Sequence, residues 1–313
     1  MLHITNGDST RLGLEPSGVP GVFRSWDDVL HEGRIPLATG ELWVGERARQ
    51  LAAAGYGTEE EMLAHMRAKG DPLDAAGEHD EVVFWFEHDT YDLLLLLRHL
   101  WWLSLPSTPR TPRYSIVIGT DYLGLLKPDQ FPPRFAARRG ITAEEIRLGA
   151  AAWQAYCGDD PAALLPFLDQ RALPYMPRAL RRLLEELPAA ADGLARSERQ
   201  ILDVLAEGTR SPGQLFMAAS RLEEDIWMAD WPFWAIVRRI AAGPHPLVAL
   251  DVEDVPAGLP AGTVTLTGAG RQVLAGGADH VALNAPSRWF GGTRLSPERD
   301  WRWTGSSVQR PSP

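Results

Sequence analysis

The sequence is poor in cysteine, with Cys157 as its only one. No intrachain disulfide is possible, which excludes a small extracellular scaffold held together by disulfides and fits a reducing compartment. Cys157 lies in an alanine-rich helical stretch, WQAYCGDD. Because free cysteines are more often buried than reactive, we expect a structural thiol there and not a nucleophile.

Long apolar runs are also missing. The longest, from Leu93 to Leu105, is interrupted by Arg98 and His99 and is too short to cross a bilayer. The N-terminal segment, MLHITNGDSTRLG, has neither the basic start nor the apolar run of a signal peptide. We therefore expect a cytoplasmic protein with no membrane partner.

Several catalytic motifs are absent. No Gly-x-Gly-x-x-Gly fingerprint follows an expected strand, and there is no Walker loop. His31-Glu32 lacks the second histidine of a zincin, and the segment around Gly7 lacks the second glycine of a nucleophile elbow. These absences argue against a dinucleotide-dependent dehydrogenase, a P-loop enzyme, a zincin and an ordinary serine hydrolase. Whether the protein is an enzyme stays open.

Positive charge is in short supply. The chain has 31 Lys and Arg against 41 Asp and Glu, a formal net charge of −10. Nucleic-acid binders are more often basic, so this balance disfavours a nucleic-acid partner and favours a small molecule or a protein. The hydrophobic fraction of 45% is that of a globular protein, and 313 residues are enough for more than one domain. The oligomeric state cannot be deduced from the sequence.

In residues 1–126 short apolar runs alternate with helical patterns. The runs predict strands, and the patterns between them predict helices, at these positions: strands 2–5, 22–26, 82–86 and 114–118; helices 46–54, 58–69 and 91–103. This alternation is typical of the α/β class, with a mostly parallel sheet flanked by helices. Residues 127–193 predict a helical connector, with helices near 142–156, 162–170 and 177–187. Capping boxes are expected at Thr58 with Glu61 and at Thr142 with Glu145, and Asp89 or Thr90 is expected to cap the helix at 91–103.

Residues 194–313 have a different rhythm. Three expected helices, a strand pair and a short helix follow one another: helices near 197–207, from Pro212 onward and near 231–242, strands at 247–251 and 264–266, and a short helix at 268–274. Three helices and then a hairpin is the winged-helix order. The third helix, which would read DNA, carries only Arg238 and Arg239 as basic residues, so we favour a module that docks on the first domain or on a partner.

The tryptophans invite a ligand-stacking interpretation. Trp101-Trp102 and Arg288-Trp289 are the clearest pairs. Tryptophan beside leucines is more often part of a core or an interface, and we expect Trp301-Arg302-Trp303 to fasten the C-terminal segment to the body.

Polar clusters follow all four expected strands. They are Asn6-Gly7-Asp8-Ser9, Asp27-Asp28, Glu87-His88-Asp89 and Gly119-Thr120-Asp121, with His31-Glu32 shortly after the second. In an open α/β sheet, ligands bind outside the carboxyl ends of the strands. Carboxylates with imidazoles suit a metal ion or acid–base chemistry. The alternative is helix capping, because Asp and Ser are preferred N-caps.

These segments carry a family resemblance. LHITNGDST, DDVLHEGRIP, GERARQLA and FWFEHDTYDLLLLL resemble an uncharacterised bacterial family, the domain of unknown function 1835, over roughly residues 1–125. The part from SERQIL through LTGAGRQVLAGG resembles the region that often accompanies that domain. The resemblance implies no activity. It singles out ten positions: Asn6, Gly7, Asp8, Ser9, His31, Glu32, Arg47, His88, Asp89 and Asp92.

The leading hypothesis is a site for a small phosphate-bearing or metal-bound ligand at the strand ends, with a divalent metal among the candidate cofactors. His88 and Asp89 are the candidate catalytic residues. The candidate ligand-binding residues are Asn6, Gly7, Asp8, Ser9, Asp28, His31, Glu32, Arg47, Asp92 and Asp121. Among them, Arg47 is expected to neutralise an anionic ligand. One alternative is a ligand-sensing transcriptional regulator that uses the winged helix. The other is a non-catalytic interaction protein, with ordinary caps at Asp8 and Asp89.

Overall fold

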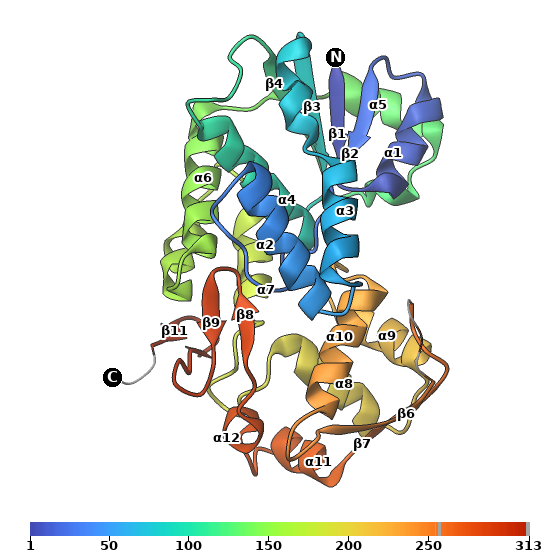
Figure 1. Cartoon of the computed structure of the whole chain (residues 1–313), viewed down its shortest axis with the longest axis vertical. Helices are drawn as coiled ribbons and strands as arrows, with labels where there is room; N and C mark the ends of the chain where they lie inside the picture. The colour runs from blue at the N-terminus through green and yellow to red at the C-terminus, as the bar shows by residue number, and fades with distance from the viewer. Residues whose placement is uncertain (254, 256–257, 311–313) are drawn as a thin grey trace.

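The first part of the chain builds a five-stranded sheet in the order β2-β1-β3-β4-β5 (Figure 1). The computed structural model describes residues 1–253, 255 and 258–310. The strands are β1 Leu2–Thr5, β2 Val22–Ser25, β3 Glu81–Phe86, β4 Arg113–Ile118 and β5 Arg139–Gly140. The first four run parallel and β5 runs antiparallel to β4. The predicted α/β class with a mostly parallel, helix-flanked sheet is confirmed, whereas β5 is too short to leave a sequence pattern.

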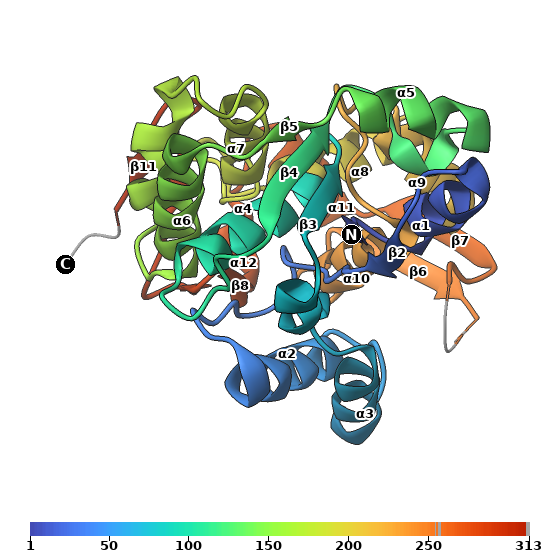
Figure 2. The same ribbon diagram turned by 90° about the horizontal axis from the view of Figure 1, so that it is seen from above.

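Helices cover both faces of the sheet (Figure 2). The central strand β3 is buried on both sides, which explains its unbroken apolar run. Val82, Phe84 and Phe86 share the larger core, while Val83 and Trp85 belong to the smaller one. The helices of the larger core are α4 Thr90–Ser104, α6 Ala143–Cys157 and α7 Met176–Leu184, and those of the smaller are α1 Asp8–Leu14 and α5 Phe131–Ala136.

A helical hairpin of α2 (Gly40–Ala53) and α3 (Glu59–Lys69) stands beside the sheet (Figure 2). The predicted capping box at Thr58 starts α3, since the Thr58 hydroxyl accepts from Glu61 N and the Glu61 carboxylate accepts from Thr58 N. No residue of α3 is buried, and its neighbour in the fold is α2. The hairpin is therefore held to the body mainly through α2.

The segment predicted as a connector, residues 127–193, contributes to the main core. Trp153 and Tyr156 of α6 and Leu180 of α7 pack in one cluster with the sheet residues. The stretch expected as a helix near 162–170 is a 3₁₀ helix over Pro161–Asp169, because Pro166 within it cannot donate to an α-helical ladder. This segment covers the sheet and does not form a separate spacer.

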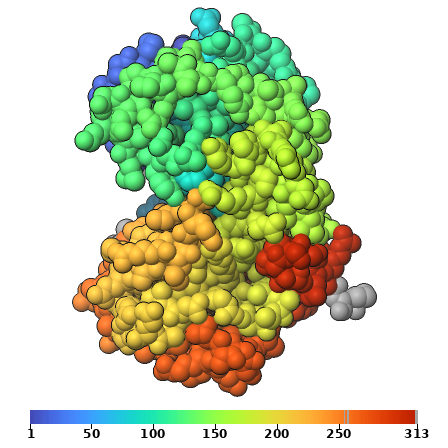
Figure 3. Space-filling model, turned by 180° about the vertical axis from the view of Figure 1, so that it is seen from behind, coloured from blue at the N-terminus to red at the C-terminus, as the bar shows by residue number. Residues whose placement is uncertain are grey.

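The helices and hairpin expected in the C-terminal part are present. They are α8 Arg196–Ala206, α9 Pro212–Ser220, α10 Asp230–Ala241, β6 Val248–Val252, β7 Gly262–Leu266 and α11 Gly268–Leu274. They enclose a hydrophobic core of their own. Whether this order amounts to a winged-helix fold stays a prediction. Viewed from behind, this yellow-to-orange part packs below the green α/β part, and the yellow-green segment joins the two (Figure 3).

The C-terminal segment returns to the first core. It contains α12 His280–Asn284, β8 Arg288–Phe290, β9 Thr293–Leu295, β10 Arg302–Trp303 and β11 Val308–Gln309. Trp301 and Trp303 pack with the core of the sheet, and Trp303 N donates to Pro188 O at 2.8 Å. The expected fastening by these tryptophans is confirmed. Residues of 194–310 thus contribute to two cores. The domain over 194–313, whose residues 311–313 lie outside the described part, stays a prediction.

None of the helices in the described residues has the length and hydrophobicity needed to cross a membrane.

Candidate functional site

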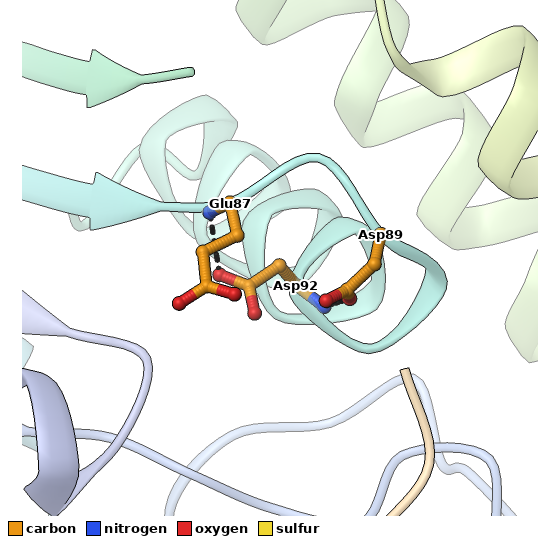
Figure 4. Close-up of side chains that lie close together, drawn as sticks. All are labelled: Glu87, Asp89 and Asp92. Atoms are coloured by element: carbon orange, nitrogen blue, oxygen red, sulfur yellow. Dashed lines mark hydrogen bonds between the residues drawn. The ribbon is translucent and has the colours of Figure 1, made fainter. Parts of the chain in front are cut away.

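Three buried carboxyl groups, from Glu87, Asp89 and Asp92, meet where β3 ends and α4 begins (Figure 4). One oxygen from each lies within 4.8 Å of the others. The residues are 8%, 4% and 2% exposed, respectively. We call this group the strand-end cluster. Asp89 and Asp92 were among the candidate site residues; Glu87 was noted in its strand-end motif but was not chosen.

Local chain geometry builds the cluster. Asp89 is the N-cap of α4, because its Oδ1 accepts from Asp92 N at 2.9 Å. Asp92 in turn accepts from Glu87 N through Oδ1 at 2.7 Å, which folds the turn back on the strand. The cap expected at Asp89 or Thr90 is therefore Asp89, and capping alone accounts for one of its oxygens.

Asn6 ties the end of β1 to this cluster. Its Nδ2 donates to Glu87 Oε1 at 3.1 Å and to Asp92 Oδ2 at 3.0 Å. The Thr10 hydroxyl donates to Asn6 Oδ1 at 2.7 Å, which fixes the orientation of the amide. Connections leave β1 and β3 toward opposite edges of the sheet, so the cluster lies at a topological switch point, the usual ligand position in such sheets.

The three carboxyl groups of the strand-end cluster are buried without a balancing positive charge from a lysine or arginine of the described residues. Burial raises the pKa of Glu87, and it raises that of Asp89 to about 7. Burial, with Asp89 and Glu87 beside it, raises the pKa of Asp92 well above its ordinary value. In the described part of the chain no lysine or arginine lies within ion-pair distance of these carboxyls. The group must hold protons or a cation to stay buried.

His88 faces the C-terminal part. Its Nε2 lies 3.1 Å from Asp225 Oδ1, and Arg178 Nη2 lies 2.5 Å from the other oxygen of Asp225. Its Nδ1 is buried and has no hydrogen-bond partner in the described residues. Asp225 belongs to the α9–α10 loop, residues 221–229, whose Ile226 N donates to Tyr122 Oη at 2.8 Å. This loop therefore covers the strand-end edge.

Four candidates near the ends of β1 and β4 lie outside the cluster: Gly7, Asp8, Ser9 and Asp121. Asp8 has a side chain 67% exposed, which accepts from Ser25 Oγ at 2.7 Å and pairs with Arg11. Asp121 is 51% exposed and pairs with Arg134 at 2.6 Å. Ser9 is exposed, and Gly7 is the N-cap of α1 with no side chain to offer. Asp8 is not a cap either, because the backbone position before α1 is that of Gly7.

Asp28 and Arg47 form a buried, bidentate ion pair. Arg47 Nη2 donates to Asp28 Oδ1 at 2.7 Å and Nε donates to Oδ2 at 2.9 Å. The same guanidinium donates to the carbonyls of Val29 and Glu32. The expectation that Arg47 neutralises an anionic ligand does not match this geometry, because its N–H groups already donate to Asp28 and to carbonyls of the loop after β2.

His31 and Glu32 face a different cavity, of about 420 Å³. The His31 ring lies 4.8 Å from the Trp227 ring and 6.5 Å from the Tyr91 ring. Both nitrogens of His31 are buried without a partner in the described part, and burial lowers its pKa to about 4. The two predicted imidazoles thus lie under the same α9–α10 loop, but His31 does not join His88 at the carboxylates.

Another cavity, of about 1090 Å³, lies between the α2–α3 hairpin and α4. Arg98 lies between the rings of Trp26 and Trp43, 4.1 Å and 4.8 Å from their centroids, and pairs with Asp71 at 2.6 Å. Two further ion pairs line this cavity, Arg67 with Glu41 at 2.8 Å and Lys69 with Asp27. Its lining comes from several separate segments, so no sequence motif marks it.

No protein-family model matches the chain, and no curated protein matches it either. The resemblance to the domain of unknown function 1835 therefore stays a prediction.

Proposed function

We propose that the strand-end cluster binds a divalent cation, and that this cation holds a small phosphate-bearing ligand. The observation that carries the proposal is the meeting of three buried carboxyl groups that no lysine or arginine of the described residues balances. Oxygens bound to one Mg²⁺ or Ca²⁺ ion, at about 2.0 to 2.6 Å from it, lie within roughly 5 Å of each other. The 4.8 Å limit of the cluster fits that spacing.

The energetics favour a hard cation. Burial of an ionised carboxylate costs several kcal/mol unless an opposite charge accompanies it. Hydrogen bonds from Asn6 and from the backbone satisfy some of the oxygens but bring no positive charge. Mg²⁺ and Ca²⁺ prefer such oxygen ligands, and Mg²⁺ held by a few carboxylates keeps positions for the oxygens of a phosphate. This preference of Mg²⁺ for phosphate oxygens is the reason why we propose a phosphate-bearing ligand.

His88 and Asp89 remain the candidates for proton transfer at the site. His88 keeps an unpartnered ring nitrogen, and Asp89 titrates near neutral pH because of its burial. The residues of the cluster are at most 8% exposed, so a ligand larger than an ion reaches them only when the α9–α10 loop moves. Asp225 and Ile226 are the loop residues whose contacts must break.

Titration calorimetry of the full chain with Mn²⁺, Mg²⁺ and Ca²⁺ tests the proposal. We expect one site in the unaltered protein, and affinity weaker by about tenfold or more in Glu87→Gln and Asp92→Asn, since each loses one anionic ligand. Asp121→Asn is the matched control, because its exposed carboxylate also follows a strand of the sheet but pairs with Arg134. Circular dichroism checks that each variant is folded. Equal affinities in all three variants would refute the proposal.

The regulator alternative finds no support in the described residues. Arg238 Nη2 donates to Ala54 O at 3.3 Å, and Arg239 pairs with Glu198 at 3.2 Å. Arg239 is thus half-buried against the chain itself, whereas Arg238 is exposed, so α10 presents a single exposed basic residue to a partner. The interaction-protein alternative predicted an ordinary cap at Asp89, which is observed, and its decisive test is the same metal titration.

A further inference from the structure

We infer that the cavity of about 420 Å³ is a second binding site, which takes a hydroxyl-bearing organic phosphate. We call it the arginine cavity. It lies where the loop after β2, the end of α2, α7, α10 and the β8–β9 hairpin meet. Four of its lining residues are arginines: Arg49, Arg239, Arg288 and Arg294. It shares no residue with the strand-end cluster.

The charge of the cavity runs against that of the chain. The whole protein carries −10, yet four arginines are among the residues that line this cavity. Arg49 and Arg239 have partners in Glu46 and Glu198. In the part of the chain described, no carboxylate lies within ion-pair distance of Arg288 or Arg294. Glu32 also lines the cavity and has no ion pair in the described residues, so the wall keeps a surplus of positive charge from these two arginines over that one carboxylate.

Arg288 is one of the two arginines of the cavity that have no carboxylate partner in the described residues. Burial and the nearby charge of Arg239 lower the pKa of Arg288. Its Nη2 donates to the backbone carbonyl of Glu186 and not to a carboxylate. The Glu186 side chain is engaged with Arg182 at 2.7 Å and with Ser197, which outweigh the effect of burial and lower its pKa to about 2. An anion entering the cavity would supply the missing negative charge.

A phosphate fits this set of donors best. The planar guanidinium fork pairs with two oxygens of a phosphate at once, and two arginines together match a dianion. Arg294 is held in place by the hydrogen bond from its Nε to Ser287 Oγ at 2.9 Å and lies over the Trp289 ring, 5.2 Å from its centroid. The ring thus orients this guanidinium at the cavity edge.

Other features of the cavity select an organic, hydroxyl-bearing ligand. Its volume lies in the range of about 300 to 1,000 Å³ typical of small-molecule sites and exceeds what inorganic phosphate fills. Glu32 also lines it, with no ion pair in the described residues, so its carboxylate is available to accept hydroxyl groups. His31 adds two unpartnered ring nitrogens, and Trp227 and Trp289 add aromatic walls. Sugar phosphates and nucleotides share this chemistry.

Calorimetric titration of the full chain with ribose 5-phosphate and with AMP tests the inference and separates its two sources. Ribose, adenosine and inorganic phosphate are the matched probes that lack one part of the ligand. We expect binding of at least one of the two phosphates, weakened about tenfold or more in both Arg288→Gln and Arg294→Gln. The exposed Arg294 keeps the test valid should Arg288→Gln fail to fold. Arg210→Gln removes the same charge far from the cavity and should leave binding unchanged.

The outcomes are distinct. No heat from either phosphate at millimolar concentration, or equal weakening in Arg210→Gln, overturns the inference. Adenosine or ribose binding as tightly as its phosphate does so too, because the arginines would then contribute nothing. Glu87→Gln should leave phosphate binding intact, so a failure of the strand-end proposal would not disturb this one.

Discussion

Replacement of Asp89 by asparagine should remove part of the pH dependence of the free energy of unfolding. The Asp89 carboxyl is 4% exposed, and burial raises its pKa from 3.8 to about 7. A carboxyl with a higher pKa in the folded chain binds more protons when folded, so the free energy of unfolding falls as the pH rises between those two values. At 1.36 kcal/mol for each pH unit, the full loss is about 4 kcal/mol.

The asparagine variant avoids that loss. Asn is as good an N-cap as Asp, so the hydrogen bond from Asp92 N to position 89 is preserved. Between about pH 5 and about pH 8 the unaltered protein should therefore lose roughly 2 to 3 kcal/mol more stability than Asp89→Asn. The variant should be the more stable protein at the higher pH.

Urea denaturation followed by circular dichroism, at several pH values, measures the difference. Mg²⁺ at millimolar concentration should restore stability to the unaltered protein at about pH 8 and have less effect on Asp89→Asn, because the cation takes the place of the proton. Parallel stability curves for the two proteins, with and without Mg²⁺, would refute both the raised pKa and its assignment to burial.

Three further predictions follow from the same contacts. Arg47→Met leaves the Asp28 carboxylate buried without its partner and should cost about 3 to 5 kcal/mol in urea unfolding, and a second change, Asp28→Leu, should recover part of that cost. The amides of α3, which has no buried residue, should exchange with D₂O faster than those of α4, and equal protection would contradict the assigned packing. Asp8→Asn should change the free energy of unfolding by less than about 0.5 kcal/mol and leave cation affinity unchanged, since its side chain is 67% exposed; calorimetry showing lost binding would restore Asp8 to the site.

Local patterns were sufficient to predict the elements that surround the strand-end cluster. The apolar run of β3 and the cap at Asp89 both act within a few residues, so they are legible in the sequence. Helix α6 likewise begins at the predicted capping box of Thr142 and Glu145. By contrast, β8 and β9 have three residues each, too few for any period to show. Arg288 and Arg294 could therefore not be assigned to a cavity.

The sequence could not show which charged residues pair with one another. Arg47 was predicted from the resemblance and its charge, and Asp121 from its position after a strand, but each pairs with a residue of its own neighbourhood. Asp225 reaches His88 from the other part of the chain. Such long-range pairing depends on how the two cores pack together, which periodicity does not encode. The convergence of Asn6 with Asp92 was predictable only in outline, from the rule on strand ends.

The α9–α10 loop connects the two proposed sites. Its Asp225 lies on His88 beside the strand-end cluster, and its Trp227 packs on His31 at the wall of the arginine cavity. Arg182 braces the segment through Glu223 at 2.6 Å and lies 5.2 Å from the Trp227 ring centroid. A displacement at one end of this short segment therefore changes packing at the other.

Thermodynamic linkage makes the consequence measurable. If entry of a ligand at the cluster moves the loop, the cation complex must alter the affinity of the arginine cavity, and the phosphate must alter cation affinity by the same factor. We expect mutual weakening, because a loop drawn away from His88 also withdraws Trp227 from the cavity wall. Titration of Mn²⁺ with and without a saturating phosphate ligand, and the reverse titration, give that factor twice. Independent affinities would mean that the loop is a fixed cover, and that the cation reaches the carboxylates without moving it.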